Sequence, residues 1–138
     1  MYPEEIVIPM KEELTENGFT ELLTAEDVEN TLSKKGTTLV MINSVCGCSA
    51  GTARPGVLLA VHKGNKKPDN ITTSFAGFDI EAVNQVRKHL LPYPPSSPAI
   101  ALFKDGQLVH MIERHMIEGR SAQMIADNLV GAFESHCN

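Results

Sequence analysis

The chain has 138 residues and a formal net charge of −5, with 12 Lys and Arg residues against 17 Asp and Glu residues. This length predicts one domain, residues 1–138, whose core needs neither a metal nor a disulfide to hold it together. The acidic balance argues against a nucleic-acid partner. No apolar run reaches the roughly 18 residues of a membrane span, and residues 1–5 lack the features of a secretory signal, so we expect a cytoplasmic protein that contacts no membrane.

The first half of the chain predicts three helices and one strand. The expected elements are a short helix after Pro9 that ends at Asn17-Gly18, a helix capped by Thr24, a strand over residues 37–43 and a helix over residues 50–62. The strand is apolar through its middle and does not alternate, which is typical of a strand covered on both faces. Pro55 should either kink the third helix or mark its true first turn.

The second half predicts three more strands and two more helices. The expected elements are a strand over residues 70–78, a helix capped by Asp79 that runs to about His89, strands over residues 99–103 and 107–113, and a last helix introduced by Gly119 and Ser121. Between the helix that ends near His89 and the strand over residues 99–103, residues 91–98 hold four prolines and should be extended. Lys104-Asp105-Gly106 is a hairpin signal that joins the last two strands.

The order of these elements predicts the fold class. Strands separated by helices imply right-handed parallel crossovers, and the final hairpin adds an antiparallel edge. We therefore expect an α/β fold with a central four-stranded mixed sheet, helices on both of its faces, and an N-terminal helical extension over residues 1–20.

The chemistry of this chain is expected at Cys46-Gly47-Cys48, between the strand over residues 37–43 and the next helix. The amides at a helix N-terminus are unpaired and carry positive partial charge, so they favour a thiolate and lower the pKa of a cysteine placed there. A disulfide across a single intervening residue closes a small, strained ring, and strained disulfides are the labile ones that exchange. The spacing therefore favours thiol–disulfide exchange over a structural bridge.

Other functions for these cysteines remain open from the sequence. The pair could be small core residues without a reaction. With His136 and Cys137 it could supply three thiolates and an imidazole to a metal, although a last helix that runs away from the pair would carry Cys137, expected as a frayed terminal thiol, about 20 Å off. The pair could also report oxidation to a binding partner without turnover.

Two further segments are expected at the same end of the sheet. Pro98 opens a strand there, and a proline at that position leaves neighbouring backbone groups free to pair with a bound chain. Arg114-His115 follows the last strand and should emerge beside the cysteine pair, where a cation would favour the thiolate. Each segment also has a plain structural interpretation, as a stiff loop or as solvated surface.

These features together resemble a known family. A strand that leads into a cysteine pair, Pro55, Pro98 and Phe103-Lys104-Asp105-Gly106 in the hairpin are similar to the thioredoxin-like fold. More narrowly, the segments that resemble the bacilliredoxin family are Asn43 to Cys48, Arg54-Pro55, Ser96-Ser97-Pro98, Arg114-His115 and His136-Cys137. The resemblance extends over nearly the whole chain.

The resemblance implies a thiol–disulfide oxidoreductase that removes bacillithiol, or a similar small thiol, from S-thiolated client proteins. Cys46 would attack the mixed disulfide, and Cys48 or a second bacillithiol would resolve it, with bacillithiol as co-substrate and no bound cofactor or metal. The substrate-binding residues that it implies are Ser97, Pro98, Gly119, Arg114 and His115. The buried carboxylate of thioredoxin corresponds to Val40 here, which favours slower exchange or isomerase behaviour over fast general reduction.

Overall fold

The computed structural model describes residues 1–138, and it begins with helix α1 (Glu4–Thr15). This helix starts before Pro9, which lies inside it, and not after Pro9 as the sequence predicts. Proline costs a helix one backbone hydrogen bond, but tertiary contacts hold α1 in place. Val7 and Leu14 are buried, and Lys11 Nζ lies 2.8 Å from Glu21 Oε1 and 2.9 Å from Asp79 Oδ2.

The sheet has five strands, in the order β1-β3-β2-β4-β5. Their bounds are β1 Thr20–Glu21, β2 Thr37–Asn43, β3 Asn70–Phe75, β4 Ala99–Lys104 and β5 Gln107–Ile112. The four strands expected from the sequence are all present. The expected count of four is wrong, because a fifth strand, β1, pairs in parallel with β3 at the edge of the sheet. Two polar residues carry no strand pattern of their own, so this strand forms through its pairing with β3.

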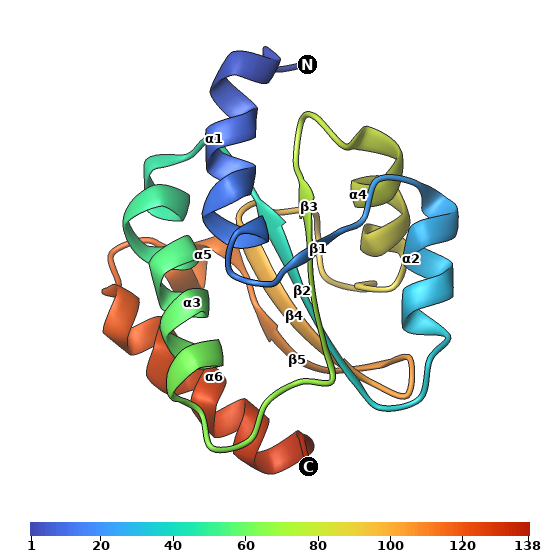
Figure 1. The fold of residues 1–138 in the computed structure, drawn as a ribbon, viewed down its shortest axis with the longest axis vertical. Helices are drawn as coiled ribbons and strands as arrows, with labels where there is room; N and C mark the ends of the chain where they lie inside the picture. The colour runs from blue at the N-terminus through green and yellow to red at the C-terminus, as the bar shows by residue number, and fades with distance from the viewer.

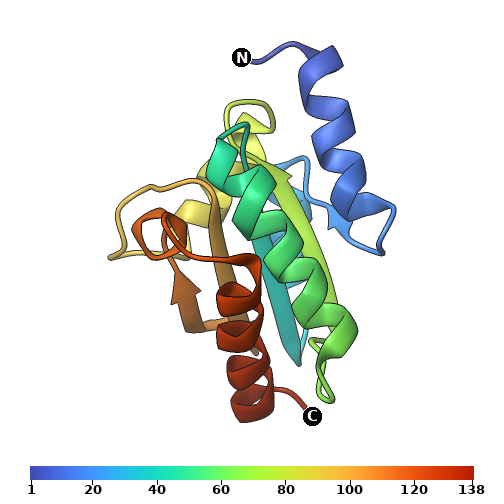
Figure 2. The same cartoon turned by 90° about the vertical axis from the view of Figure 1, so that its left-hand side faces the viewer.

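Helices cover both faces of the sheet, as predicted (Figures 1 and 2). The remaining helical elements are α2 Ala25–Leu32, a π-helical turn η1 Ser49–Ala53, α3 Arg54–Lys63, α4 Ile80–Lys88, α5 Arg114–Ile117 and α6 Ala122–His136. One apolar core lies between the sheet and α1, α3 and α6. A second core lies between the sheet and α2 and α4. All seven residues of β2 are buried because this central strand faces both cores.

The N-cap residues of α2, α4 and α6 are those that the sequence predicts, but one of them makes no capping hydrogen bond. Thr24 caps α2 by accepting from the Asp27 amide at 3.0 Å, and Ser121 caps α6 by accepting from the Met124 amide at 3.1 Å. Asp79 precedes α4 but its carboxylate makes no capping bond. It is the N-cap residue, as the sequence predicts, but its carboxylate accepts from the Phe75 amide and pairs with Lys11 instead.

Three local features differ from the sequence prediction or refine it. The helix after β2 begins with η1, and Pro55 lies in the first turn of α3. The short helix α5 occupies a segment for which no element was predicted. The hairpin between β4 and β5 turns at Asp105 and Gly106, with φ of 50° and 80°, which is the left-handed conformation that such two-residue turns require.

The sheet register determines which segments meet at the candidate site. β2 and β4 are antiparallel, with Ile42 opposite Ala99. The segment that leaves β2 toward Cys46 therefore starts beside the segment that enters β4 from Pro98. β5 ends at the same end of the sheet, because Ile112 pairs with Ile100. None of the helices combines the length and the apolar character needed to cross a membrane.

Candidate active site

Cys46 and Cys48 lie between β2 and the helical segment that begins at η1, the position that the sequence predicts. They form a disulfide in this structure, with their Cα atoms 5.3 Å apart. Both are half-buried, and Cys48 packs against the core under α3 and α6. Gly47 between them is exposed, has no positive φ, and would meet nothing within 4 Å if it carried a Cβ. The pair is therefore at the surface, with Cys48 on its inner side.

Three backbone amides donate to Cys46, one to its sulfur and two to its carbonyl oxygen. The Cys48 amide donates to Cys46 Sγ at 3.3 Å. The Cys46 carbonyl accepts from the amides of Ser49 at 2.9 Å and Ala50 at 3.3 Å, so helical hydrogen bonding begins at this residue. A sulfur at the positive end of a helix, with an amide directed at it, is stabilised as a thiolate. Cys46 is thus placed to act as a nucleophile.

A buried polar network supports the cysteine loop from below. Asn43 Oδ1 accepts from the Ser44 amide at 2.9 Å, the Ser49 hydroxyl at 3.0 Å and Arg54 Nη1 at 2.9 Å. Arg54 Nη1 also donates to the Ser44 carbonyl at 3.0 Å and lies 3.1 Å from Ser49 Oγ. The residues on either side of the cysteine motif are therefore held by one amide and one guanidinium.

Sequence reasoning gave no role to this network. Asn43, Ser44 and Arg54 lie in segments that resemble the bacilliredoxin family, but the resemblance assigned them no role. Arg54 joins the network because the helical turn after Cys48 brings its side chain back under the loop. The available signal was the polar character of Asn43 at the end of an otherwise apolar buried strand, since a buried amide needs partners.

The expected substrate-binding residues Ser97, Pro98 and Arg114 lie together at the end of the sheet from which the cysteine segment leaves β2. The Ser97–Pro98 peptide is cis and immediately precedes β4. Arg114 Nη1 donates to the Ser97 carbonyl at 3.3 Å, and Arg114 Nε pairs with Glu118 at 3.0 Å. Arg114 thus contacts the proline segment, while its hydrogen bonds and ion pair involve neither cysteine.

His115 and Gly119 occupy different surroundings. The His115 side chain is 74% exposed and its nearest carboxylate, on Glu113, is 3.8 Å away. Gly119 has φ of +75° in the turn between α5 and α6, a conformation that glycine adopts without a steric penalty. The next residue contacts the cysteine side of the molecule, because Thr52 Oγ1 donates to the Arg120 carbonyl at 3.0 Å.

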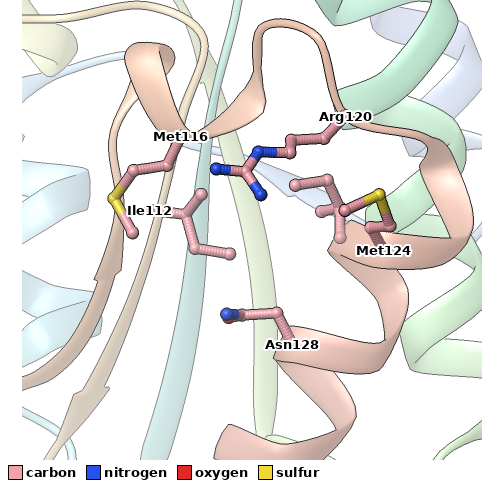
Figure 3. Close-up of a pocket in the computed structure, with 6 residues that line it drawn as sticks. Ile112, Met116, Arg120, Met124 and Asn128 are labelled. Atoms are coloured by element: carbon pink, nitrogen blue, oxygen red, sulfur yellow. The ribbon is translucent and has the colours of Figure 1, made fainter.

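A cavity of about 260 Å³ opens beside this turn, between β5, α5 and α6. Its lining residues are Ile112, Met116, Arg120, Met124, Ile125 and Asn128. Figure 3 shows the Arg120 guanidinium directed into the cavity between the side chains of Met116 and Met124. The Arg120 backbone thus links this cavity to the turn that follows Cys48.

Cys137 lies at the other end of the sheet, and the expectation of a frayed terminal thiol is wrong. It is 4% exposed and belongs to the apolar core. Its thiol interacts with Thr37 at the start of β2, whereas Cys46 follows the end of that strand. A strand of this length separates them by roughly 20 Å, so His136 and Cys137 do not join the Cys46–Cys48 pair in one metal site.

Burial is the main cause that raises the pKa of the Cys137 thiol, although its hydrogen bond with Thr37 acts in the opposite direction. We therefore expect the reduced native protein to be alkylated at Cys46 at pH 8 while Cys137 reacts at least about tenfold more slowly. Unfolding in urea should remove the difference. Peptide mass mapping after timed labelling measures both rates, and equal native rates would contradict this placement.

The pKa of Cys137 also gives a direction for stability against pH. The folded protein favours the neutral thiol, so the contribution of Cys137 to the free energy of unfolding is complete below the ordinary thiol pKa and is lost as the pH rises above it.

Comparison with known proteins identifies the family of this chain. The family model described as "Disulphide isomerase" matches residues 2–137. A bacilliredoxin of Cytophaga hutchinsonii is 62% identical over 134 residues, which cover 97% of this chain and 98% of that protein. A bacilliredoxin of Halalkalibacterium halodurans is 50% identical over 137 residues, covering 99% and 94%.

Solved structures show the same fold at low sequence identity. Mitochondrial thioredoxin 3 from Saccharomyces cerevisiae superposes with a TM-score of 0.58 at 14% identity, covering 89% of this chain and 98% of that one. A putative oxidoreductase with a thioredoxin fold gives a TM-score of 0.64, also at 14% identity, over 81% and 96% of the two chains. With a thioredoxin-like fold, a close Cys46–Cys48 pair and relatives matched over nearly their full length, the chain belongs to the bacilliredoxin family of thiol–disulfide oxidoreductases.

Proposed function

We propose that this oxidoreductase removes bacillithiol from S-bacillithiolated proteins in the cytoplasm, with Cys46 as the nucleophile. The observation that carries the proposal is the environment of Cys46 Sγ, which accepts the Cys48 amide where helical hydrogen bonding begins. The names of the relatives support bacillithiol as the small thiol. Cys48 is the second thiol, because it is near enough to bond to Cys46 and packs against the core.

The reaction is two successive thiol–disulfide exchanges. The Cys46 thiolate attacks the bacillithiol sulfur of the mixed disulfide, the client thiolate leaves, and Cys46 carries the bacillithiol. The Cys48 thiolate then attacks Cys46 Sγ, which releases bacillithiol and leaves the Cys46–Cys48 disulfide. Alternatively a second bacillithiol attacks, which leaves bacillithiol disulfide and the reduced protein. In the first route, two further equivalents of small thiol return the pair to its reduced form.

The substrate-binding surface in this proposal consists of Ser97, Pro98, Gly119, Arg114 and His115. The Ser97–Pro98 segment lies beside the end of β2, where its backbone can pair with a client chain. Arg114 holds this segment through the Ser97 carbonyl. The exposed His115 and the turn at Gly119 form the outer part of the surface.

The choice of small thiol is tested by one client protein prepared with two modifications, bacillithiol and glutathione. With the small thiol of the substrate as reductant, we expect kcat/KM to be at least about tenfold higher for the bacillithiol form, equivalent to ~1.4 kcal/mol of differential transition-state binding. An unrelated thioredoxin serves as the control for client accessibility. Equal rates, or faster removal of glutathione, would contradict bacillithiol as the substrate and leave the exchange chemistry in place.

A further inference from the structure

Arg54 is an unusual residue for the interior of a small protein, because its charged side chain is 2% exposed. Burying a charge is costly unless hydrogen bonds and an opposite charge compensate it. Arg54 Nη1 bonds to Asn43 Oδ1 and to the Ser44 carbonyl. Its Nε lies 3.1 Å from Glu13 Oε2. The compensation is incomplete, because the Arg54 Nε–H has no hydrogen-bond partner and meets Glu13 only as an ion pair. A charge kept buried at this cost points to a role beyond filling space.

The Arg54 guanidinium contacts Ser44 and Ser49, and each of these two residues is hydrogen-bonded to Cys46. The Cys46 amide donates to Ser44 Oγ at 3.2 Å, and Ser44 carries a carbonyl bonded to Arg54. The Cys46 carbonyl accepts from the Ser49 amide, and Ser49 carries a hydroxyl 3.1 Å from Arg54. A positive charge buried beneath the loop that carries a half-buried sulfur favours the thiolate, and burial weakens the screening by water.

The carboxylate that compensates Arg54 comes from a different part of the chain. Glu13 lies on α1, which packs beside α3 (Figure 1). Its side chain is 46% exposed, so water and salt reach it while Arg54 stays buried. A second contact joins the same helix to the network, because Asn43 Nδ2 donates to the Met10 carbonyl at 3.1 Å. The N-terminal helix is thus linked to the loop that presents the cysteines.

We propose that the Glu13–Arg54 ion pair sets the fraction of Cys46 present as thiolate. Arg54 is a positioning residue that holds the cysteine loop and supplies positive charge, and Glu13 reduces that charge. The inference rests on Cys46 as the nucleophile, but it does not depend on the identity of the small thiol.

Other charged groups lie farther from the network or are engaged elsewhere. Arg114 pairs with Glu118 on α5, and Lys11 on α1 pairs with Glu21 and Asp79. His115 is exposed to solvent. The Arg120 side chain points into the cavity beside α6 (Figure 3). Glu13 is therefore the one carboxylate paired with Arg54.

The test is the pKa of Cys46 in two variants that should shift it in opposite directions. Glu13→Gln keeps the size and an acceptor oxygen but removes the negative charge, so the Cys46 pKa should fall by about 0.5 unit, a roughly threefold rise in the thiolate-to-thiol ratio. Arg54→Met removes the positive charge and should raise the pKa by about one unit. Arg54→Lys keeps the charge and should restore most of the shift.

The measurement is the rate of alkylation of Cys46 against pH, in a Cys48→Ser background that leaves one fast thiol. Glu12→Gln is the matched control, because Glu12 is the exposed neighbour of Glu13 and has no ion pair in the structure. If the network only stiffened the loop, both substitutions would shift the pKa in the same direction, and this outcome would overturn the proposal. So would a Glu13→Gln shift no larger than that of Glu12→Gln.

The Glu13→Gln arm decides the question alone if Arg54→Met fails to fold, since a lowered pKa supports the proposal and an unchanged or raised one overturns it. A failure of the proposed function would be distinguishable, because it would appear as a high Cys46 pKa in the parent protein and not as a wrong order among the variants.

Discussion

A Cys46→Ser variant should lose at least about 10³-fold in the rate at which the protein releases a small thiol from a mixed disulfide, by the scale of nucleophile removal in other enzymes. A serine hydroxyl remains protonated at neutral pH and cannot form the sulfur–sulfur bond that carries the transferred thiol. The Cys48 amide would then have no thiolate to stabilise. Release of the small thiol from a labelled client protein, followed over time, measures the loss.

The other two cysteines provide matched controls. Cys48→Ser should still take up the small thiol on Cys46, and it should require a second small thiol to complete a turnover. Cys137→Ser should retain the parental rate, because Cys137 lies at the opposite end of β2 and is buried in the core. If Cys46→Ser kept more than about a tenth of the parental rate, or if Cys137→Ser lost activity in the folded state, the assignment of the nucleophile would be wrong.

Replacement of Asn43 by Ala should lower the free energy of unfolding by about 3 kcal/mol, because it leaves the buried Arg54 guanidinium without its shortest acceptor. The change also removes the acceptor for the Ser44 amide and the Ser49 hydroxyl, and the donor to the Met10 carbonyl. Several buried groups would thus lose a partner at once. Urea unfolding of the reduced protein with linear extrapolation measures the effect.

An amide on the surface is the control for this substitution. Asn128 is exposed and its Oδ1 contacts His110 Nε2 at 2.6 Å. Asn128→Ala should change the free energy of unfolding by less than about 0.5 kcal/mol. A loss for Asn43→Ala as small as that for Asn128→Ala would show that the network beneath the cysteine loop contributes little to stability.

The fold was predictable wherever the sequence pattern itself encodes burial. The apolar run over residues 37–43 becomes the central strand, and the hairpin turn at Asp105-Gly106 forms as its residues predict. The strand β1, which was not predicted, and the start of α1, which was misplaced, both depend on distant partners. β1 has two polar residues and exists through its pairing with β3. The α1 helix includes Pro9 because contacts with the rest of the protein compensate the lost hydrogen bond.

The site was predictable where its residues are adjacent in sequence or where the order of the strands brings segments to one end of the sheet. Cys46, Gly47 and Cys48 lie between a buried strand and a helix, and both elements carry clear signals. Glu13 and Arg54 meet only in the folded chain, so no local pattern relates them. The burial of Cys137 was missed for a similar reason, because the terminal turn of α6 packs against the start of β2.

The central claim is that the Cys48 amide and the helical start stabilise Cys46 as a thiolate at the protein surface. Its most direct test is the pKa of Cys46 in the reduced protein, obtained from the alkylation rate of that residue between pH 4 and pH 10. We expect a value at least about one unit below the free-cysteine reference of about 8.5. A value at or above that reference would contradict the claim.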